Sequence, residues 1–354
     1  MDSVTQLALG AVVGEAVAGR RLGRKAALWG AVLGTLPDLD VLIRYADPVA
    51  DFTRHRSFTH SLLVITLCTP LLARVLGAWH GNWSAERRSW LLLVFFCLTT
   101  HALLDACTVY GTQLLWPLDT TPRGLGNLFI IDPLVTLPLL MGAGCALATR
   151  KRWASRVNLA ALTLVLGYVA WSFLAREVAL QRARQALEPD GLAAAPMHAL
   201  AAPFNTLLWR VVVMEEGGYR VGWTSLLDQD RTLRFQRYPS AQVLAEPLAS
   251  STSLQRLRWF TGGFYALREQ QGQVIFTDLR MGIEGAYAFE FIIGTHREGA
   301  WLPAGPRQLE RSFDGLTLQP LWHRMFGDQE MPWPPVDAAP LHGSEEPGEL
   351  APAD

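Results

Sequence analysis

The sequence has almost no net charge and few cysteines. Its 31 Lys and Arg residues nearly balance 32 Asp and Glu residues, which gives a formal net charge of -1 over 354 residues. A nucleic-acid-binding protein needs clustered positive charge to replace the counterions around phosphates, so that class is excluded. The cysteines all lie in apolar stretches without a Cys-x-x-Cys pair, which excludes a disulfide framework and a zinc knuckle and predicts core packing. They are Cys68, Cys97, Cys107 and Cys145.

Charged residues are also scarce in the first half of the chain. Before Arg176 the sequence is a succession of apolar stretches of roughly 17 to 25 residues, the length that crosses about 30 Å of hydrocarbon. After Arg176, charged and apolar residues alternate. The N-terminus lacks a basic region and a small-residue cleavage pattern, so we expect no removable signal peptide. The sequence therefore predicts an α-helical polytopic membrane domain over residues 1–175 and a soluble domain after it.

The apolar stretches predict about six membrane helices, of which the first two are short or broken. Pro37 lies within the second stretch, and proline removes a backbone donor and usually ends or kinks a helix. A broken or re-entrant element is compatible with a membrane when protein lines it. The predicted helices are Ser3–Gly19, Ala26–Ile43, Ser57–Trp79, Trp90–Tyr110, Leu128–Thr149 and Val157–Ala175.

Positive charge in the short loops predicts the orientation, because cytoplasmic loops retain an excess of Lys and Arg. Ten such residues lie on one side: Arg20, Arg21, Arg24, Lys25, Arg87, Arg88, Arg150, Lys151, Arg152 and Arg156. Four lie on the other side: Arg44, Arg54, Arg56 and Arg123. Six crossings then place the N-terminus and the C-terminal domain outside the cytoplasm, which means the periplasm of a Gram-negative cell with the helices in its inner membrane.

Polar residues that membrane helices normally avoid occur in three segments of the membrane domain. The second predicted helix ends with two aspartates, the third opens with two histidines, and the fourth carries a His and an Asp in its outward half. The topology brings all six to one membrane face, where ionisable groups usually pair, bind ions or line a wet cavity. They are Asp38, Asp40, His55, His60, His101 and Asp105.

These six residues predict a divalent metal site. His101 and Asp105 are four residues apart, so they share one helix face. Imidazole and carboxylate together suit zinc first, with manganese or iron as alternatives, and six candidates are enough for two ions. Each motif alone has a simpler interpretation, as a hydrogen-bonded pair, a solvated helix end or an interfacial loop capped by Ser57. Their presence on one face favours the metal.

Other residues in the same layer have expected roles in catalysis or in orienting ligands and substrate. Arg56 is a candidate clamp for a phosphate, because its planar guanidinium fits an oxyanion, although a lipid-headgroup or loop contact is an equal alternative. Asp132 is either an outer carboxylate or a charge at a helix N-terminus. Thr59, Tyr110 and Gln113 are candidates for orienting ligands or substrate, and Tyr110 also fits an interfacial aromatic belt.

The same motifs resemble the bacterial membrane-bound metal-dependent hydrolases, some of which are described as LexA-regulated inner-membrane proteins. The matching blocks are Asp2–Gln6, Leu36–Asp40, His55–His60 and His101–Gly111, in that order. The resemblance implies a hydrolytic activity and the same six metal-site candidates. Many relatives have a His where this chain has Gln6, a poorer ligand, which implies a site completed by the other residues.

The soluble half predicts a small, strand-rich α+β domain. Residues 176–203 are expected to extend the last helix and then form a linker, residues 204–332 to form a periplasmic accessory domain, and residues 333–354 to be a disordered tail. Turn signals at 215–218 and 270–272 indicate hairpins, and 240–261 reads as helical. The predicted strands are 207–214, 219–226, 232–237, 264–268, 274–279 and 286–295.

The favoured function is hydrolysis of an ester or phosphoester in a lipid-like substrate by a metal-activated water at the outer headgroup level, with Asp38 or Asp40 accepting the proton. A transporter of metal or protons, or a metal-binding membrane protein, is the main alternative. That alternative requires a polar path toward the cytoplasm, and the segments 64–67 and 92–96 contain no ionisable residue. A third interpretation, a membrane anchor for the soluble domain, leaves the polar cluster unexplained.

Overall fold

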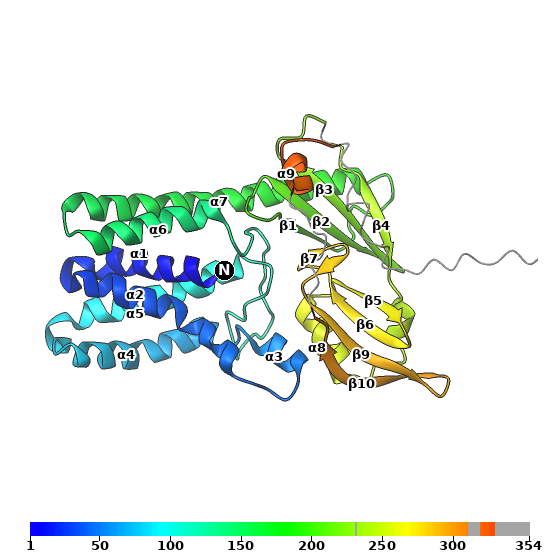
Figure 1. The fold of residues 1–354 in the computed structure, drawn as a ribbon, viewed down its shortest axis with the longest axis horizontal. Helices are drawn as coiled ribbons and strands as arrows, with labels where there is room; N and C mark the ends of the chain where they lie inside the picture. The colour runs from blue at the N-terminus through cyan, green and yellow to red at the C-terminus, as the bar shows by residue number, and fades with distance from the viewer. Residues whose placement is uncertain (231, 311–318, 330–354) are drawn as a thin grey trace, which may run out of the picture.

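The computed structural model describes residues 1–230, 232–310 and 319–329, and the predicted tail at 333–354 lies outside them. A helical region comes first in the chain, and a region of antiparallel sheets follows it (Figure 1). This order confirms the predicted combination of a helical domain and a strand-rich domain.

The helical region contains six longer helices, each of which overlaps one of the six predicted segments with different bounds. They are α1 (Ser3–Leu22), α2 (Arg24–Thr35), α4 (Leu62–Trp79), α5 (Trp83–Ala106), α6 (Pro133–Ala148) and α7 (Arg152–Leu187). Among the described residues, three helices are long and apolar enough to cross a membrane, namely α4, α5 and α7. α6 is apolar but has 16 residues. Six crossings therefore remain a prediction.

Short elements interrupt the helices at the end of the bundle that carries the polar motifs. α2 ends at Thr35, and Pro37 opens a 3₁₀ helix, η1 (Pro37–Leu42), as its position predicted. The third predicted helix begins later than expected, because α3 (Pro48–Arg54) and the 3₁₀ turn η2 (Phe58–His60) precede it. A buried Ser61 then caps α4. The polar motifs thus lie on short, tightly turned segments.

Glycines bring α1 and α2 into backbone contact. Gly10 and Gly14 on α1 face Gly30 and Gly34 on α2, and both pairs have the four-residue spacing typical of close helix packing in membranes. A Cβ atom at Gly10 would lie 2.1 Å from the carbonyl oxygen of Gly30, and one at Gly34 would lie 2.4 Å from that of Gln6. No larger side chain fits this crossing without moving a helix.

The strand-rich region consists of two four-stranded antiparallel sheets and a small hairpin. The first sheet has β1 (Met197–Ala201), β2 (Leu208–Glu215), β3 (Gly218–Ser225) and β4 (Phe235–Pro239) in sequential order. The second has the order β10 (Ala300–Gln308), β9 (Glu290–Arg297), β6 (Gln273–Asp278) and β5 (Tyr265–Gln270). The remaining elements are η3 (Gln242–Ala245), α8 (Thr252–Thr261), β7 (Gly282–Ile283), β8 (Ala286–Tyr287) and α9 (Gln319–Met325).

Two of the longer strands, β1 and β10, lie where the sequence predicted none, as does the two-residue β7. β1 falls within the segment 176–203 that was expected to be helix extension and linker, and its Ala-rich sequence resembles a linker more than a strand. It is nevertheless paired with β2 along its whole length. β10 is an exposed edge strand containing two prolines, which hid its alternation. Both strands depend on pairing partners rather than on local propensity.

The strand-rich region packs against the end of the bundle that carries the polar motifs (Figure 1). Phe52 of α3 lies with its ring centroid 4.7 Å from that of Phe260 and 4.5 Å from that of Phe289. The backbone N–H of Ala201 donates to the carbonyl of Gly126, 2.9 Å away. The two regions therefore share a core at this end.

Candidate metal centre

Four of the six predicted ligands converge at the end of the bundle that packs against the strand-rich region. Asp38 on η1, His60 on η2 and the pair His101 and Asp105 on α5 each offer one ligand atom, and these atoms all lie within 4.8 Å of one another. His60, His101 and Asp105 are fully buried, whereas the side chain of Asp38 is 22% exposed. A buried group of two imidazoles and two carboxylates is a donor set typical of zinc.

Hydrogen bonds set the tautomers of both histidines. Thr59 donates its hydroxyl to Asp40 Oδ2 at 2.7 Å, so the contact of 2.9 Å between its oxygen and His60 Nδ1 requires a proton on that nitrogen. His101 Nδ1 lies 2.7 Å from the carbonyl oxygen of Gly34, which can only accept. Both Nε2 atoms are thus unprotonated when the imidazoles are neutral, as metal ligation requires.

The distances between the four ligand atoms fit one small ion. His60 Nε2 lies 3.0 Å from His101 Nε2, and the two nitrogens lie 3.2 and 3.5 Å from Asp105 Oδ2. Their distances to Asp38 Oδ1 are 3.4 and 3.6 Å. A tetrahedral ion with bonds of about 2.0 Å separates its ligands by about 3.3 Å. Asp38 Oδ1 is buried and makes no hydrogen bond within the described residues, so it is available to a cation.

Asp40 and His55, the other two predicted ligands, form a pair beside this cluster. His55 Nδ1 lies 2.6 Å from Asp40 Oδ1, and Asp40 Oδ2 accepts from the backbone N–H of Arg56 and from Thr59. Burial alone would raise the pKa of Asp40, but its contacts with His55 and Thr59 outweigh burial and lower it. The contacts of Asp40 therefore fix the segment 55–60. The side chain of His55 is 20% exposed.

The side chain of Arg56 is buried, whereas the phosphate clamp predicted from the sequence would face solvent. Its side chain is 5% exposed, with Nε 3.1 Å from Asp105 Oδ2 and Nη1 donating to Thr108 at 3.1 Å. Its backbone has a φ of 60°, a conformation that costs energy for a residue with a side chain and that often occurs at functional sites. The guanidinium balances the charge of Asp105 instead of facing solvent.

The remaining predicted site residues lie at different distances from the cluster. Gln6 donates to Asp105 Oδ1 at 2.9 Å, and the terminal amino group of Met1 contacts the same oxygen. Tyr110 lies with its ring centroid 5.2 Å from that of His55 and donates to the carbonyl of Phe52. Gln113 donates to Thr53, also on α3. Asp132 lies away from the cluster, where it caps α6 and accepts from Tyr168.

Sequence reasoning missed the backbone contribution of Gly34. Its carbonyl fixes the tautomer of His101, and Gly34 itself belongs to the glycine contact between α2 and α1. The signal was present as two pairs of glycines four residues apart, at 10 and 14 and at 30 and 34. Those spacings indicate close helix packing, but they do not show that the carbonyl of Gly34 contacts His101.

Comparison with known proteins gives a family. The sequence profile described as YdjM inner membrane protein matches residues 1–179. The chain belongs to this family. The match spans the helical bundle with all four cluster residues, and it ends within α7, before the first strand. No curated protein and no solved structure matches the chain.

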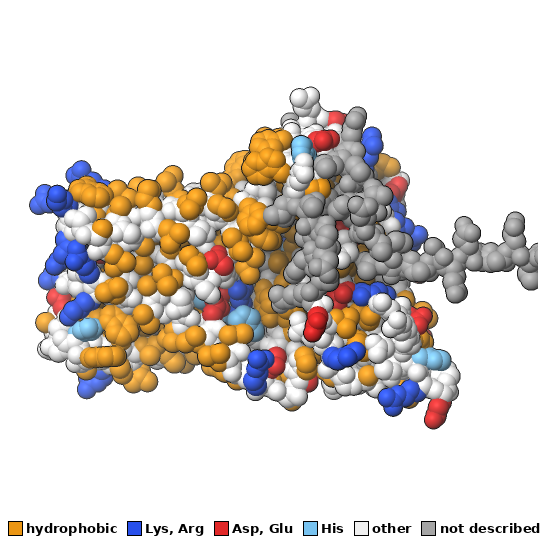
Figure 2. Space-filling model, viewed as in Figure 1, with side chains coloured by type: hydrophobic (Ala, Val, Ile, Leu, Met, Phe, Trp, Pro, Cys, Tyr) orange, Lys and Arg blue, Asp and Glu red, His pale blue; other side chains and the backbone are white. Residues whose placement is uncertain are grey.

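Membership of the YdjM family and the apolar helices together support an inner-membrane location and contact with the lipid bilayer. The exposed side chains of the bundle are largely hydrophobic, whereas Lys and Arg gather at the end away from the sheets (Figure 2). Acidic and histidine side chains are visible where the bundle meets the strand-rich region (Figure 2). The four cluster residues lie at this same end of the bundle, on η1, on η2 and near the end of α5.

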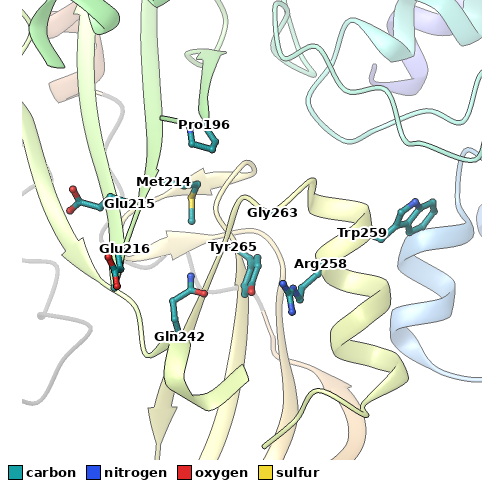
Figure 3. A pocket seen from close by; sticks show the side chains of 10 residues that line it. Pro196, Met214, Glu215, Glu216, Gln242, Arg258, Trp259, Gly263 and Tyr265 are labelled. Carbon is teal, nitrogen blue, oxygen red and sulfur yellow. The ribbon is translucent and has the colours of Figure 1, made fainter. Parts of the chain in front are cut away.

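A hollow of different composition lies between the two sheets of the strand-rich region (Figure 3). Its volume is about 710 Å³, and Met214, Glu215, Arg258 and Tyr265 are among its lining residues. Glu215 is already paired there with Arg220 and Arg237, outside the lining. None of the four cluster residues contributes to this hollow, so the two sites are separate.

Proposed function

We propose that this protein is a membrane-bound metal-dependent hydrolase that acts at the periplasmic face on an ester or phosphoester of a lipid-like substrate. The observation that carries the proposal is the convergence of His60 Nε2 and His101 Nε2, 3.0 Å apart, with two carboxylates around them. Two imidazole nitrogens at this distance repel unless a metal ion or a proton lies between them, and the two carboxylates beside them make a divalent cation the favoured occupant. Zinc is the ion proposed, and bound there it would activate water and polarise the scissile group.

The pair of Asp40 and His55 is proposed as the acid and base of the reaction. Asp40 holds His55 through Nδ1, which leaves Nε2 of a partly exposed ring at the edge of the cluster. A carboxylate that orients an imidazole in this way is a recurring arrangement for moving protons. The sequence assigned the proton to Asp38 or Asp40, but Asp38 is proposed as a ligand and Asp40 as the residue that positions His55.

The proposed orientation follows from the charge at the two ends of the bundle. The turns that join α1 to α2, α4 to α5 and α6 to α7 lie together at one end (Figure 1). Lys and Arg gather there (Figure 2), and positive charge marks the cytoplasmic side. The cluster and the strand-rich region are at the opposite end, which is why we assign them to the periplasm.

The metal or proton transporter is the competing function. It requires polar groups that continue from the cluster through the bundle. Below His101 the described core contains apolar side chains, among them Leu98, Val94 and Leu93, which are all buried. This core favours a site that opens at one face.

Metal analysis of the detergent-purified protein tests the proposal. We expect about one bound ion per chain in the wild type, and its loss in a double variant with His101→Ala and Asp105→Ala. Asp132→Asn is a matched control, because that carboxylate lies on the same bundle outside the cluster and should leave the metal in place.

Hydrolysis is then measured on phosphodiesters and carboxylic esters with long and short acyl chains. Loss of activity in the double variant, with activity retained in Asp132→Asn, is the expected result. A wild type that binds metal but hydrolyses none of these substrates would favour the transporter.

A further inference from the structure

Exposed apolar side chains follow one line along α2 and η1. Leu28, Val32 and Leu36 are four residues apart, which keeps them on one face of an α-helix, and they are 55%, 50% and 37% exposed. Leu39 and Leu42 then follow at intervals of three, the spacing that aligns side chains on a 3₁₀ helix, and they are 53% and 73% exposed. We call these five residues the α2 stripe.

The α2 stripe leads from the lipid-facing side of the bundle to the metal cluster. Its last three members, Leu36, Leu39 and Leu42, alternate in sequence with Asp38 and Asp40 of η1. Asp38 is the most exposed of the four cluster residues. An apolar chain lying along the stripe would therefore end beside the one carboxylate that the surroundings can reach.

Positive charge lies just past the outer end of the stripe. The side chain of Arg44 is 83% exposed, and its nearest acidic partner, Asp51, is 3.6 Å away. Arg54 is exposed as well, and its guanidinium lies over the ring of Tyr45. An apolar track that ends at exposed arginines complements an acyl chain with an anionic headgroup.

The aqueous side of the cluster is closed by the strand-rich region. Phe260 and Phe289 pack on Phe52 and Tyr110, with centroid distances of 4.5 to 6.0 Å. Tyr110 in turn lies under the guanidinium of Arg56, 5.2 Å from its ring centroid. Aromatic packing thus covers the side of Tyr110 and Phe52 that faces the strand-rich region, whereas Asp38 and His55 remain partly exposed.

We propose that the α2 stripe is an acyl-chain track that delivers a membrane phospholipid laterally to Asp38. The inference rests on the proposed function for what happens to the lipid, but the track itself is a binding surface that needs no turnover. The site then selects a lipid substrate by the position of its headgroup at the end of the track.

Photolabelling tests the track directly. The purified protein in detergent receives one equivalent of phosphatidylglycerol with a photoreactive diazirine on its acyl chain, and the labelled peptides are mapped by mass spectrometry. We expect at least about fivefold more label on residues 24–44 than on the α7 segment with Leu166 and Leu174, which are 60% and 66% exposed. Leu39→Asp should reduce this label to the α7 level. Val243→Asp is the matched control, since Val243 is 75% exposed on η3 and lies off the track.

Each outcome supports or overturns the track. Equal labelling of α2 and α7, or label that survives Leu39→Asp, would overturn it, as would a dimer that covers α2 in place of lipid. Metal content separates this failure from that of the proposed function. If the lipid label is selective but the chain holds no metal, the track is supported and the proposed hydrolase function fails. If the chain holds metal and rapidly hydrolyses a short-chain soluble phosphodiester but the label is even, the proposed function is supported and the track fails.

Discussion

His60 and His101 face each other through their Nε2 atoms at 3.0 Å, although they lie 41 residues apart in the chain. Each ring is held from behind, one by Thr59 and the other by the carbonyl of Gly34. Both contacts are made through Nδ1, so Nε2 is the nitrogen that each neutral ring leaves free to bind a cation. The pair defines the centre of the cluster, and Asp38 and Asp105 complete it.

Replacing His55 by Ala should abolish hydrolysis without removing the metal. His55 contacts Asp40 and lies outside the group of four, so its loss leaves every proposed ligand in place. A lost acid or base lowers kcat by about 10²- to 10⁴-fold. Metal content and steady-state rates on the same preparation check this. Metal loss in His55→Ala equal to that in His101→Ala would mean that His55 is a ligand.

Thr59→Val should weaken metal binding. The substitution removes the hydroxyl that joins Asp40 to His60, so the imidazole loses the contact that fixes its tautomer. Loss of such an outer partner lowers metal affinity by about 10- to 100-fold. Competition with a chelator measures the change. Thr66→Val is the control, since that hydroxyl bonds only to its own helix, and an equal effect there would contradict the role of Thr59.

Gly30→Ala should destabilise the protein and lower its metal affinity. The added methyl would lie 2.1 Å from the carbonyl oxygen of Gly10, so α1 and α2 must separate, and the carbonyl of Gly34 moves away from His101. Overpacking of this kind costs about 1–3 kcal/mol. Thermal unfolding in detergent gives the stability. Gly144→Ala has open space around the new methyl and should leave both properties unchanged.

Acid should weaken the junction between the strand-rich region and the bundle through His198. Burial, with Arg176 and Arg280 nearby, lowers the pKa of His198 to about 4. Its pKa in the unfolded chain is about 6.5, so the unfolded state binds the proton first as pH falls. The stability contributed by the neutral ring is complete above about pH 6.5 and is lost as pH falls toward 4.

Thermal unfolding of the wild type and of His198→Gln across this range measures the effect. The wild type should lose about 1–3 kcal/mol more than the variant between pH 6.5 and 4. Parallel pH profiles would show that His198 does not couple to folding. His323, which lies on α9 away from the junction, provides the control as His323→Gln.

The sequence was sufficient for what depends on local pattern and composition. Apolar length located the helices, Pro37 located the break after α2, and the three polar motifs identified the four cluster residues. It could not divide the six candidates into four that converge and two that pair, because that depends on where η1 places Asp40 and where the end of α3 places His55. The burial of Arg56 behind Asp105 and the pairing of β1 likewise result from contacts between distant segments.

The most direct test of the account is X-ray absorption spectroscopy on the zinc-loaded protein, with metal quantified on the same sample. The account predicts one ion per chain with nitrogen and oxygen ligands at about 2.0 Å, including two imidazoles. The two-imidazole signal should persist in His55→Ala and disappear in His101→Ala. A wild type without a bound ion, or an unchanged spectrum in His101→Ala, would contradict it.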